Sequence, residues 1–160
     1  MMEELQKAYL EGSDEDREIL ELALQSIRQR KERGSYYLSG FLGLKGRFLD
    51  EKTYQFIVPV TTFMYNSLGV VHGGITTTLI DSTMGSLVNR SLPEGLYAVT
   101  TELKTNFIRA VKTGTLRSEA KILHRGRQLV FLEGSVYDER DRLITHATAT
   151  FMILGEEKAK

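Results

Sequence analysis

The chain has no cysteine among its 160 residues. This absence excludes disulfide bonds, thiolate metal ligands and a cysteine nucleophile. An excess of one charge is also lacking, because 21 basic residues balance 21 acidic ones, and no run of like charge is long enough to indicate nucleic-acid binding. No apolar run is long enough for a membrane span, and the acidic start Met-Met-Glu-Glu is unlike a signal peptide. We therefore expect a cytoplasmic protein with no nucleic-acid or membrane partner.

The chain does have enough apolar sequence for one substantial core, since 41% of its residues are hydrophobic. We divide it into an N-terminal segment, 1–34, and a main domain, 35–160. Residues 1–12 are polar, and we expect them to be loosely held. Ser13 precedes three acidic residues, a pattern that is typical of a helix N-cap. Gly34 follows a basic stretch and is predicted to end the helix. One amphipathic helix is predicted between them, covering a sheet or packing on a partner subunit.

The main domain shows strand patterns separated by short turns. Extended runs are predicted at 41–49, 53–60, 97–107, 115–124, 128–137 and 143–153. Short connections favour antiparallel neighbours. Between the second and third runs, apolar residues recur at helical spacing: Ile75, Leu79, Ile80, Met84, Leu87 and Val88. The sequence therefore predicts an α+β fold in which five to six antiparallel strands wrap one central helix, followed by a charged tail at 154–160.

The tripeptide His72-Gly73-Gly74 stands where a loop becomes this helix. A helix start carries backbone N–H groups without intrahelical acceptors, together with the positive end of the helix dipole. Glycine at such a place lets another molecule approach the backbone closely. These properties suit a carbonyl oxygen that must take on negative charge.

Asp81 is an ionisable residue in the middle of this apolar helix, where burial without a partner is costly. It lies eight residues after Gly73, which is about 12 Å along a helix axis. The two residues of one chain are therefore too far apart to act on the same carbonyl. If they share a site, a second copy must supply one of them through antiparallel helices related by a twofold axis. This hypothesis predicts an obligate homodimer, with further pairing into a homotetramer left open.

A wider pattern resembles a known family. The pattern joins Asn66-x-x-Gly-x-x-His72-Gly73-Gly74 to Asp81 and to the strand Thr100-x-Glu-Leu-Lys-x-Asn-Phe-Ile-Arg109. It resembles the hotdog-fold acyl-CoA thioesterases of the phenylacetate-degradation and hydroxybenzoyl-CoA type. The resemblance covers residues 38–154 and leaves the extra N-terminal helix outside the usual core. One departure is Ala110, where the family often has proline.

The resemblance implies a role for each matching residue. The Gly73 amide would polarise the thioester carbonyl, and Asp81 of the other subunit would act as general base or nucleophile. Asn66 would position the water or the carbonyl, His72 would orient the loop, and Thr100 would assist the attacking water. Coenzyme A, which is part of the substrate and not a cofactor, would meet basic residues at the edge of the sheet, with these candidates: Arg109, Arg125, Gly126 and Arg127.

The chemistry agrees with the resemblance. Thioester hydrolysis needs a polarised carbonyl, a water held in line and a carboxylate that takes its proton or attacks directly. We therefore expect an acyl-CoA thioesterase that releases a free acid and CoA. An apolar or aromatic acyl group is suggested by the residues near the motif: Phe63, Met64, Tyr65, Leu68 and Met84.

Other interpretations stay open. Asp81 could instead be a buried acid whose carboxylate is hydrogen-bonded to threonines. Asn66 could be an ordinary loop-turn residue, and Arg125 and Arg127 could be solvated turn residues. Two further histidines, at 124 and 146, lack metal-ligand spacing, so no metal site is expected. For the whole chain, the alternatives are a hotdog hydratase, which the family comparison disfavours, and a non-catalytic acyl-CoA sensor or binding module.

Overall fold

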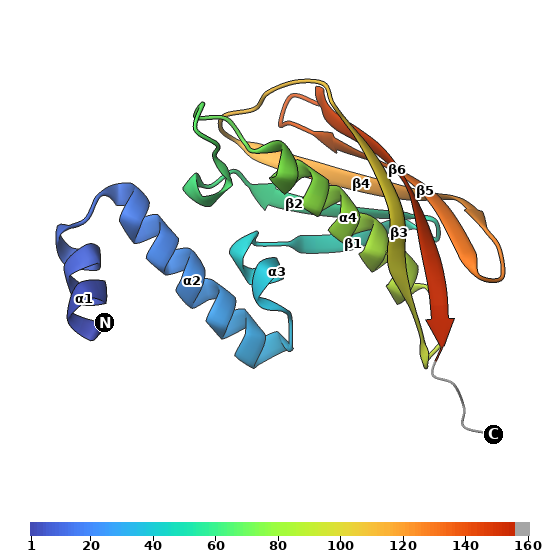
Figure 1. The fold of residues 1–160 in the computed structure, drawn as a ribbon, viewed down its shortest axis with the longest axis horizontal. Coiled ribbons are helices and arrows are strands. Elements are labelled where there is room, and N and C mark those ends of the chain that lie inside the picture. Colours follow the sequence, from blue (N-terminus) through green and yellow to red (C-terminus); the bar gives the residue numbers. More distant parts are fainter. Residues whose placement is uncertain (156–160) are drawn as a thin grey trace.

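A six-stranded antiparallel sheet wraps around one long helix, α4 (Gly73–Arg90), in the computed structural model (Figure 1). The structure describes residues 1–155, so most of the predicted tail at 154–160 lies outside the described residues. The strand order is β1-β2-β4-β5-β6-β3. The predicted α+β layout of a sheet around a central helix is confirmed. The strands are β1 (Lys45–Asp50), β2 (Thr53–Pro59), β3 (Leu96–Phe107), β4 (Thr115–Arg125), β5 (Leu129–Tyr137) and β6 (Leu143–Gly155).

The core lies between α4 and the inner face of the sheet. Most apolar residues of α4 that recur at helical spacing are buried, and Ile75 is partly buried against the same core, as the sequence predicts for a helix with one face on a sheet. The buried Thr83 hydroxyl donates to the Leu79 carbonyl and lies 2.7 Å from the Ser118 hydroxyl of β4, so its polar atom is satisfied. The opposite face of α4 carries small and polar residues: Thr77, Thr78, Asp81, Ser82, Gly85 and Ser86.

Alternate residues of each strand point toward α4, and β5 shows this most clearly. Val130, Leu132 and Val136 are buried, whereas Leu129 and Phe131 on the other face are exposed. Gly134 marks the closest approach of the helix, because a Cβ atom there would lie 2.8 Å from the Met84 methyl group. A glycine at this point allows α4 to pack directly on the sheet.

Strand β3 forms one edge of the sheet and contains a β-bulge. It pairs with β6, and the register shifts between Thr100 and Glu102. In a regular strand, residues 100 and 107 would face opposite sides of the sheet, since they are an odd number of residues apart. The bulge adds the extra residue Thr101. Both Thr100 and Phe107 therefore reach α4, the first near the middle of the helix and the second at its start.

The N-terminal segment contains two helices, α1 (Met2–Glu11) and α2 (Asp14–Arg33), which lie to one side of the sheet (Figure 1), with α2 in contact with residues 37–41 and 62–64. The ends of α2 are as predicted, with a capping box at Ser13 and Gly34 in the left-handed conformation at φ 67°. Residues 2–11 form a helix that the polar pattern of 1–12 did not predict. Strong helix formers such as Leu, Glu, Gln, Lys and Ala make α1 helical without apolar periodicity, and none of its residues is buried.

The predicted strand at 41–49 begins later than expected. Residues 37–41 form a short helix, α3 (Tyr37–Phe41), and β1 starts at Lys45. Contacts with α2 explain the difference, because Gln25 donates to the Gly40 carbonyl (2.8 Å) and the Ser26 hydroxyl donates to the Tyr37 carbonyl (2.5 Å). Tertiary contacts thus override the local extended pattern.

Among the described residues, no helix combines the length and the apolar character that crossing a membrane requires.

Truncation of the α4 core should test this packing. Leu87 is fully buried, with 0% of its surface exposed, so we expect Leu87→Ala to lower the free energy of unfolding by about 2–5 kcal/mol. The matched control is Leu10→Ala on α1, where the side chain is 66% exposed and the expected change is within about 0.5 kcal/mol. Urea unfolding at one fixed protein concentration measures both. Equal losses in the two variants would contradict this description of the core.

Candidate active site

A hydrogen-bonded loop leads into the start of α4. The Asn66 side-chain oxygen accepts from the backbone N–H groups of Leu68 (2.9 Å) and Val70 (3.4 Å). Gly69 takes the left-handed conformation that this turn needs, at φ 67°. The His72 N–H then donates to the Met64 carbonyl (2.8 Å), which brings His72 to the first turn of the helix. Asn66 therefore has the loop-turn role that the sequence left as its alternative.

His72 caps the N-terminus of α4. Its Nδ1 atom accepts from the Gly74 N–H at 2.8 Å, and its carbonyl accepts from the Ile75 N–H at 2.9 Å. The Gly73 N–H has no acceptor within residues 1–155. The cap thus leaves one free donor at the positive end of the helix dipole.

The ring of Phe107, at the end of β3, lies beside this free donor. A Cβ atom at Gly73 would come within 2.9 Å of the Phe107 ring. Glycine therefore leaves room for the ring, and the ring forms an apolar wall next to the Gly73 amide.

Asp81 is half-buried on α4 and is held by β3. The Thr100 hydroxyl donates to the Asp81 Oδ1 atom at 2.7 Å. The structure thus brings together two residues that the sequence predicted for one site. Within the described residues, the Oδ2 atom accepts no hydrogen bond, so one carboxylate oxygen stays available for chemistry.

Gly73 and Asp81 do not meet within one chain. Both belong to the continuous helix α4, and eight residues of helix place them about 12 Å apart along its axis. The free amide and the carboxylate therefore occupy separate places on one protomer.

The basic candidates lie at opposite ends of α4. Arg109 follows β3 near the start of the helix and donates to the Leu143 carbonyl at 2.8 Å. Arg125 donates to the carbonyl and hydroxyl of Ser91, which caps the other end of α4. Gly126 and Arg127 belong to the turn that follows Arg125. Within a single chain, Arg109 therefore lies far from the turn at 125–127.

The acyl-lining residues expected from the sequence divide into three sets. Met64 and Met84 are core residues with no exposed surface, so their expected place in a pocket is wrong. Phe63 and Leu68 are exposed on the loop before α4, by 40% and 79%. The Tyr65 hydroxyl donates to the Lys112 carbonyl at 2.6 Å and so belongs to the loop framework.

Neither of the remaining two histidines lies near this site. The His146 Nδ1 atom lies 3.1 Å from the Ser135 hydroxyl, and the His124 ring lies beside Phe131. Among residues 1–155, no group of three or more histidine or acidic side chains is arranged to hold a metal ion.

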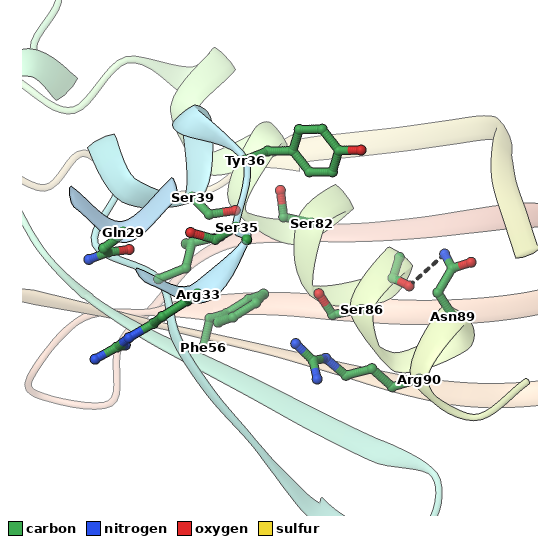
Figure 2. A pocket seen from close by; sticks show the side chains of 13 residues that line it. Gln29, Arg33, Ser35, Tyr36, Ser39, Phe56, Ser82, Ser86, Asn89 and Arg90 are labelled. Carbon is green, nitrogen blue, oxygen red and sulfur yellow. Dashed lines mark hydrogen bonds between the residues drawn. The ribbon is translucent and has the colours of Figure 1, made fainter. Parts of the chain in front are cut away.

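Sequence reasoning missed a cavity of about 780 Å³ between the end of α2 and the C-terminal half of α4 (Figure 2). Its walls include Arg33, Ser35 and Tyr36 on one side and Ser82, Gly85 and Arg90 on the other. The two sides are about fifty residues apart in the chain, so no local pattern could have indicated the cavity.

The antiparallel sheet that wraps α4 defines a hotdog-fold protein, and its central helix begins with a backbone amide that has no acceptor among residues 1–155. Residues 68–145 match the family model described as Thioesterase superfamily. The proofreading thioesterase EntH of Cronobacter sakazakii is 31% identical over 115 residues, which are 71% of this chain and 83% of that protein. A protein of Saccharolobus solfataricus with an esterase name is 32% identical over 92 residues, but the match spans only 61% of that protein's length.

A solved structure is similar over nearly the whole chain. The BH2602 protein from Bacillus halodurans, crystallised with CoA, has a TM-score of 0.86 and 30% identity, covering 96% of this chain and 100% of that one. The chain therefore belongs to the Thioesterase superfamily and is a thioester hydrolase of the hotdog fold.

The His72 cap generates a stability prediction. His72→Ala removes the acceptor of the Gly74 N–H, and we expect it to lower the free energy of unfolding by about 0.5–2 kcal/mol. His72→Asn supplies a side-chain acceptor that is favoured at helix N-caps and should restore most of this loss. Urea unfolding of the three proteins checks both expectations. If alanine and asparagine were equally destabilising, the cap would not be the reason for histidine at this position.

Proposed function

We propose that this protein hydrolyses an acyl-CoA thioester to a free acid and CoA, at a site that Gly73 shares with Asp81 of a partner subunit. The observation that carries the proposal is the Gly73 N–H, which is free at the start of α4 while His72 takes the neighbouring amide. Membership of the Thioesterase superfamily and the CoA named with the Bacillus halodurans structure support the choice of substrate.

The proposed reaction uses the free amide and the free carboxylate oxygen. The thioester carbonyl oxygen accepts from the Gly73 N–H, which stabilises the negative charge that develops during attack. The Asp81 carboxylate either takes a proton from the attacking water or attacks the carbonyl carbon itself. The carbon–sulfur bond then breaks and the thiolate of CoA leaves. If Asp81 acts as general base, the proton that it took from water passes to the thiolate, and the acid is released directly. If Asp81 attacks, the acyl group remains on it as an anhydride, and water hydrolyses this anhydride to the free acid while its other proton goes to the thiolate. The Thr100 hydroxyl holds Oδ1, which directs Oδ2 toward the reacting centre.

The edge strand β3 supplies a way to bring the two groups together. Its outer edge has no strand partner among the described residues, and an open edge is a natural place for pairing with another copy. Phe107 of β3 lies next to Gly73, and Thr100 of β3 is hydrogen-bonded to Asp81, so these two strand residues show where the two helix residues lie along β3. Antiparallel pairing of β3 with the same strand of a second copy, about an axis near the middle of 100–107, would place each Gly73 near the partner's Asp81.

The same twofold axis would bring the basic residues of the two subunits close to one another. It reverses the direction of the partner's α4, so the partner's Arg125 and Arg127 would lie at the same end of the dimer as Arg109. We propose that these side chains bind the phosphates of CoA, for which arginine is well suited. Asn66 and His72 act through the loop and the cap, and they position the Gly73 amide.

Substitution of Gly73 can remove the donor without removing the helix. Proline is favoured at the first position of a helix, and His72, at φ −63° and ψ 135°, already has the extended conformation preferred before proline. We expect Gly73→Pro to lower kcat about a hundred- to thousandfold, as loss of an oxyanion donor does elsewhere. Gly73→Ala is the control, because it meets the same Phe107 ring but keeps the N–H. Thiol release from short, medium, long and aryl acyl-CoAs measures both variants.

Equal loss in the two Gly73 variants would remove the amide from its proposed role. A wild-type protein that releases no thiol from any member of this panel would instead favour the non-catalytic binding module.

Mixing two inactive variants tests the shared site. A heterodimer of Gly73→Pro with Asp81→Asn has one site with both defects and one site with neither. We therefore expect a refolded equal mixture to recover about a quarter of the wild-type activity, because random pairing makes half of the dimers mixed and half of their sites intact. Each variant refolded alone is the control. Failure of the mixture to exceed the two controls, with dimers present by light scattering, would contradict a site built from two subunits.

A further inference from the structure

The cavity between α2 and α4 has a polar, positively charged lining (Figure 2). Ser35 and Ser39 on the α2–α3 side face Ser82 and Ser86 of α4 across it, with Phe56 at the base. Two arginines line the cavity, Arg33 at the end of α2 and Arg90 at the end of α4, and no acidic residue among 1–155 does. A polar cavity with only positive charge favours an anionic or acceptor-rich ligand.

Three of the lining residues leave polar or charged groups without an ion or hydrogen-bond partner in the described part of the chain. Asn89, in contrast, is hydrogen-bonded to Gly85 and Ala98, and the Arg90 guanidinium lies over the Tyr54 ring at 5.8 Å. Neither Arg33 nor Arg90 forms an ion pair within residues 1–155. The Ser35 hydroxyl is buried and has no hydrogen-bond partner among the same residues. A buried hydroxyl without a partner is costly, and a ligand that accepts from it would remove that cost.

The cavity begins next to the proposed reacting centre. Ser82 follows Asp81 in the sequence, Gly85 lies one helical turn beyond it, and Arg90 lies nine residues beyond it, which is about 13 Å along the axis. The twofold axis of the proposed dimer would bring the partner's loop, with its exposed Phe63 and Leu68, over this part of α4. Nine residues of helix also turn Arg90 about 180° away from Asp81 around the axis. An acyl group whose carbonyl is held at Asp81 would therefore cross the outer face of α4, over Gly85 and Ser82, to enter the cavity of the subunit that supplies this aspartate.

We infer that this cavity is the acyl-binding site, and that the substrates are acyl-CoAs whose acyl group ends in a second carboxylate. The inference rests on the proposed function and differs from the apolar acyl group that the sequence suggested. Arg90 extends from α4 toward Phe56 at the base of the cavity (Figure 2), so it is the first anchor of the carboxylate. Arg33 adds a second positive charge at the end of α2.

Two thioesters of equal chain length test the inference. Adipoyl-CoA ends in a carboxylate, whereas hexanoyl-CoA ends in a methyl group. We expect wild-type kcat/KM to be at least about tenfold higher for adipoyl-CoA, which is a typical effect of a hydrogen bond to a charged group. The double variant Arg33→Gln/Arg90→Gln should lose this preference by slowing adipoyl-CoA hydrolysis much more than hexanoyl-CoA hydrolysis. Arg90→Lys, which keeps the positive charge, should retain part of the preference.

Arg28→Gln is the matched control, because Arg28 lies on α2 but does not line the cavity, and it should keep the wild-type ratio of the two rates. Hexanoyl-CoA hydrolysis by the double variant also shows that it is folded. Equal wild-type rates on the two substrates, or an unchanged ratio in the double variant, would overturn the inference while leaving the thioesterase proposal intact. Absence of thiol release from both substrates and from the wider acyl-CoA panel would overturn the proposed function, and this inference with it.

Discussion

The burial of one face of α4 against the sheet is the constraint on which the other features depend. Leu79, Met84 and Leu87 have almost no exposed surface, and glycine at position 134 lets the helix lie directly on β5. A helix held in this way is a rigid rod, so the axial distance between its first amide and its central carboxylate cannot change. The proposed need for a second copy of the chain therefore comes from the packing of the core, because no loop movement could bring Gly73 and Asp81 of one chain together.

The start of α4 combines stabilisation with an available donor. A side chain that caps a helix usually removes the unsatisfied N–H groups of the first turn. Here the His72 imidazole accepts from Gly74 and leaves the Gly73 amide free. Phe107 covers one side of that amide with an apolar ring, and a hydrogen bond in a less polar setting is stronger than one in water. The cap therefore supports the helix without using the group that the proposed chemistry needs.

Features that depend on local pattern could be predicted from the sequence, and features that depend on contacts between distant segments could not. The strands, the central helix and the ends of α2 at Ser13 and Gly34 follow from periodicity and capping. The candidate residues at the start and middle of α4 could be predicted for the same reason. The α3 helix depends on docking against α2, and the cavity depends on α2 and α4 lying on opposite sides of it. The sequence placed Asn66 in the loop but could not show which backbone N–H groups its side chain accepts from, since those bonds depend on the folded turn.

The β-bulge in β3 has a consequence for how this strand can vary in length. Because Thr101 is an added residue, Thr100 and Phe107 both face α4 although an odd number of positions separates them. Deleting or inserting one residue between them would turn one of the two side chains to the outer face, whereas a change of two residues would keep both in place. The two contacts therefore restrict changes in the length of this segment to even numbers of residues, and they restrict parity more than they restrict the identity of each residue between them.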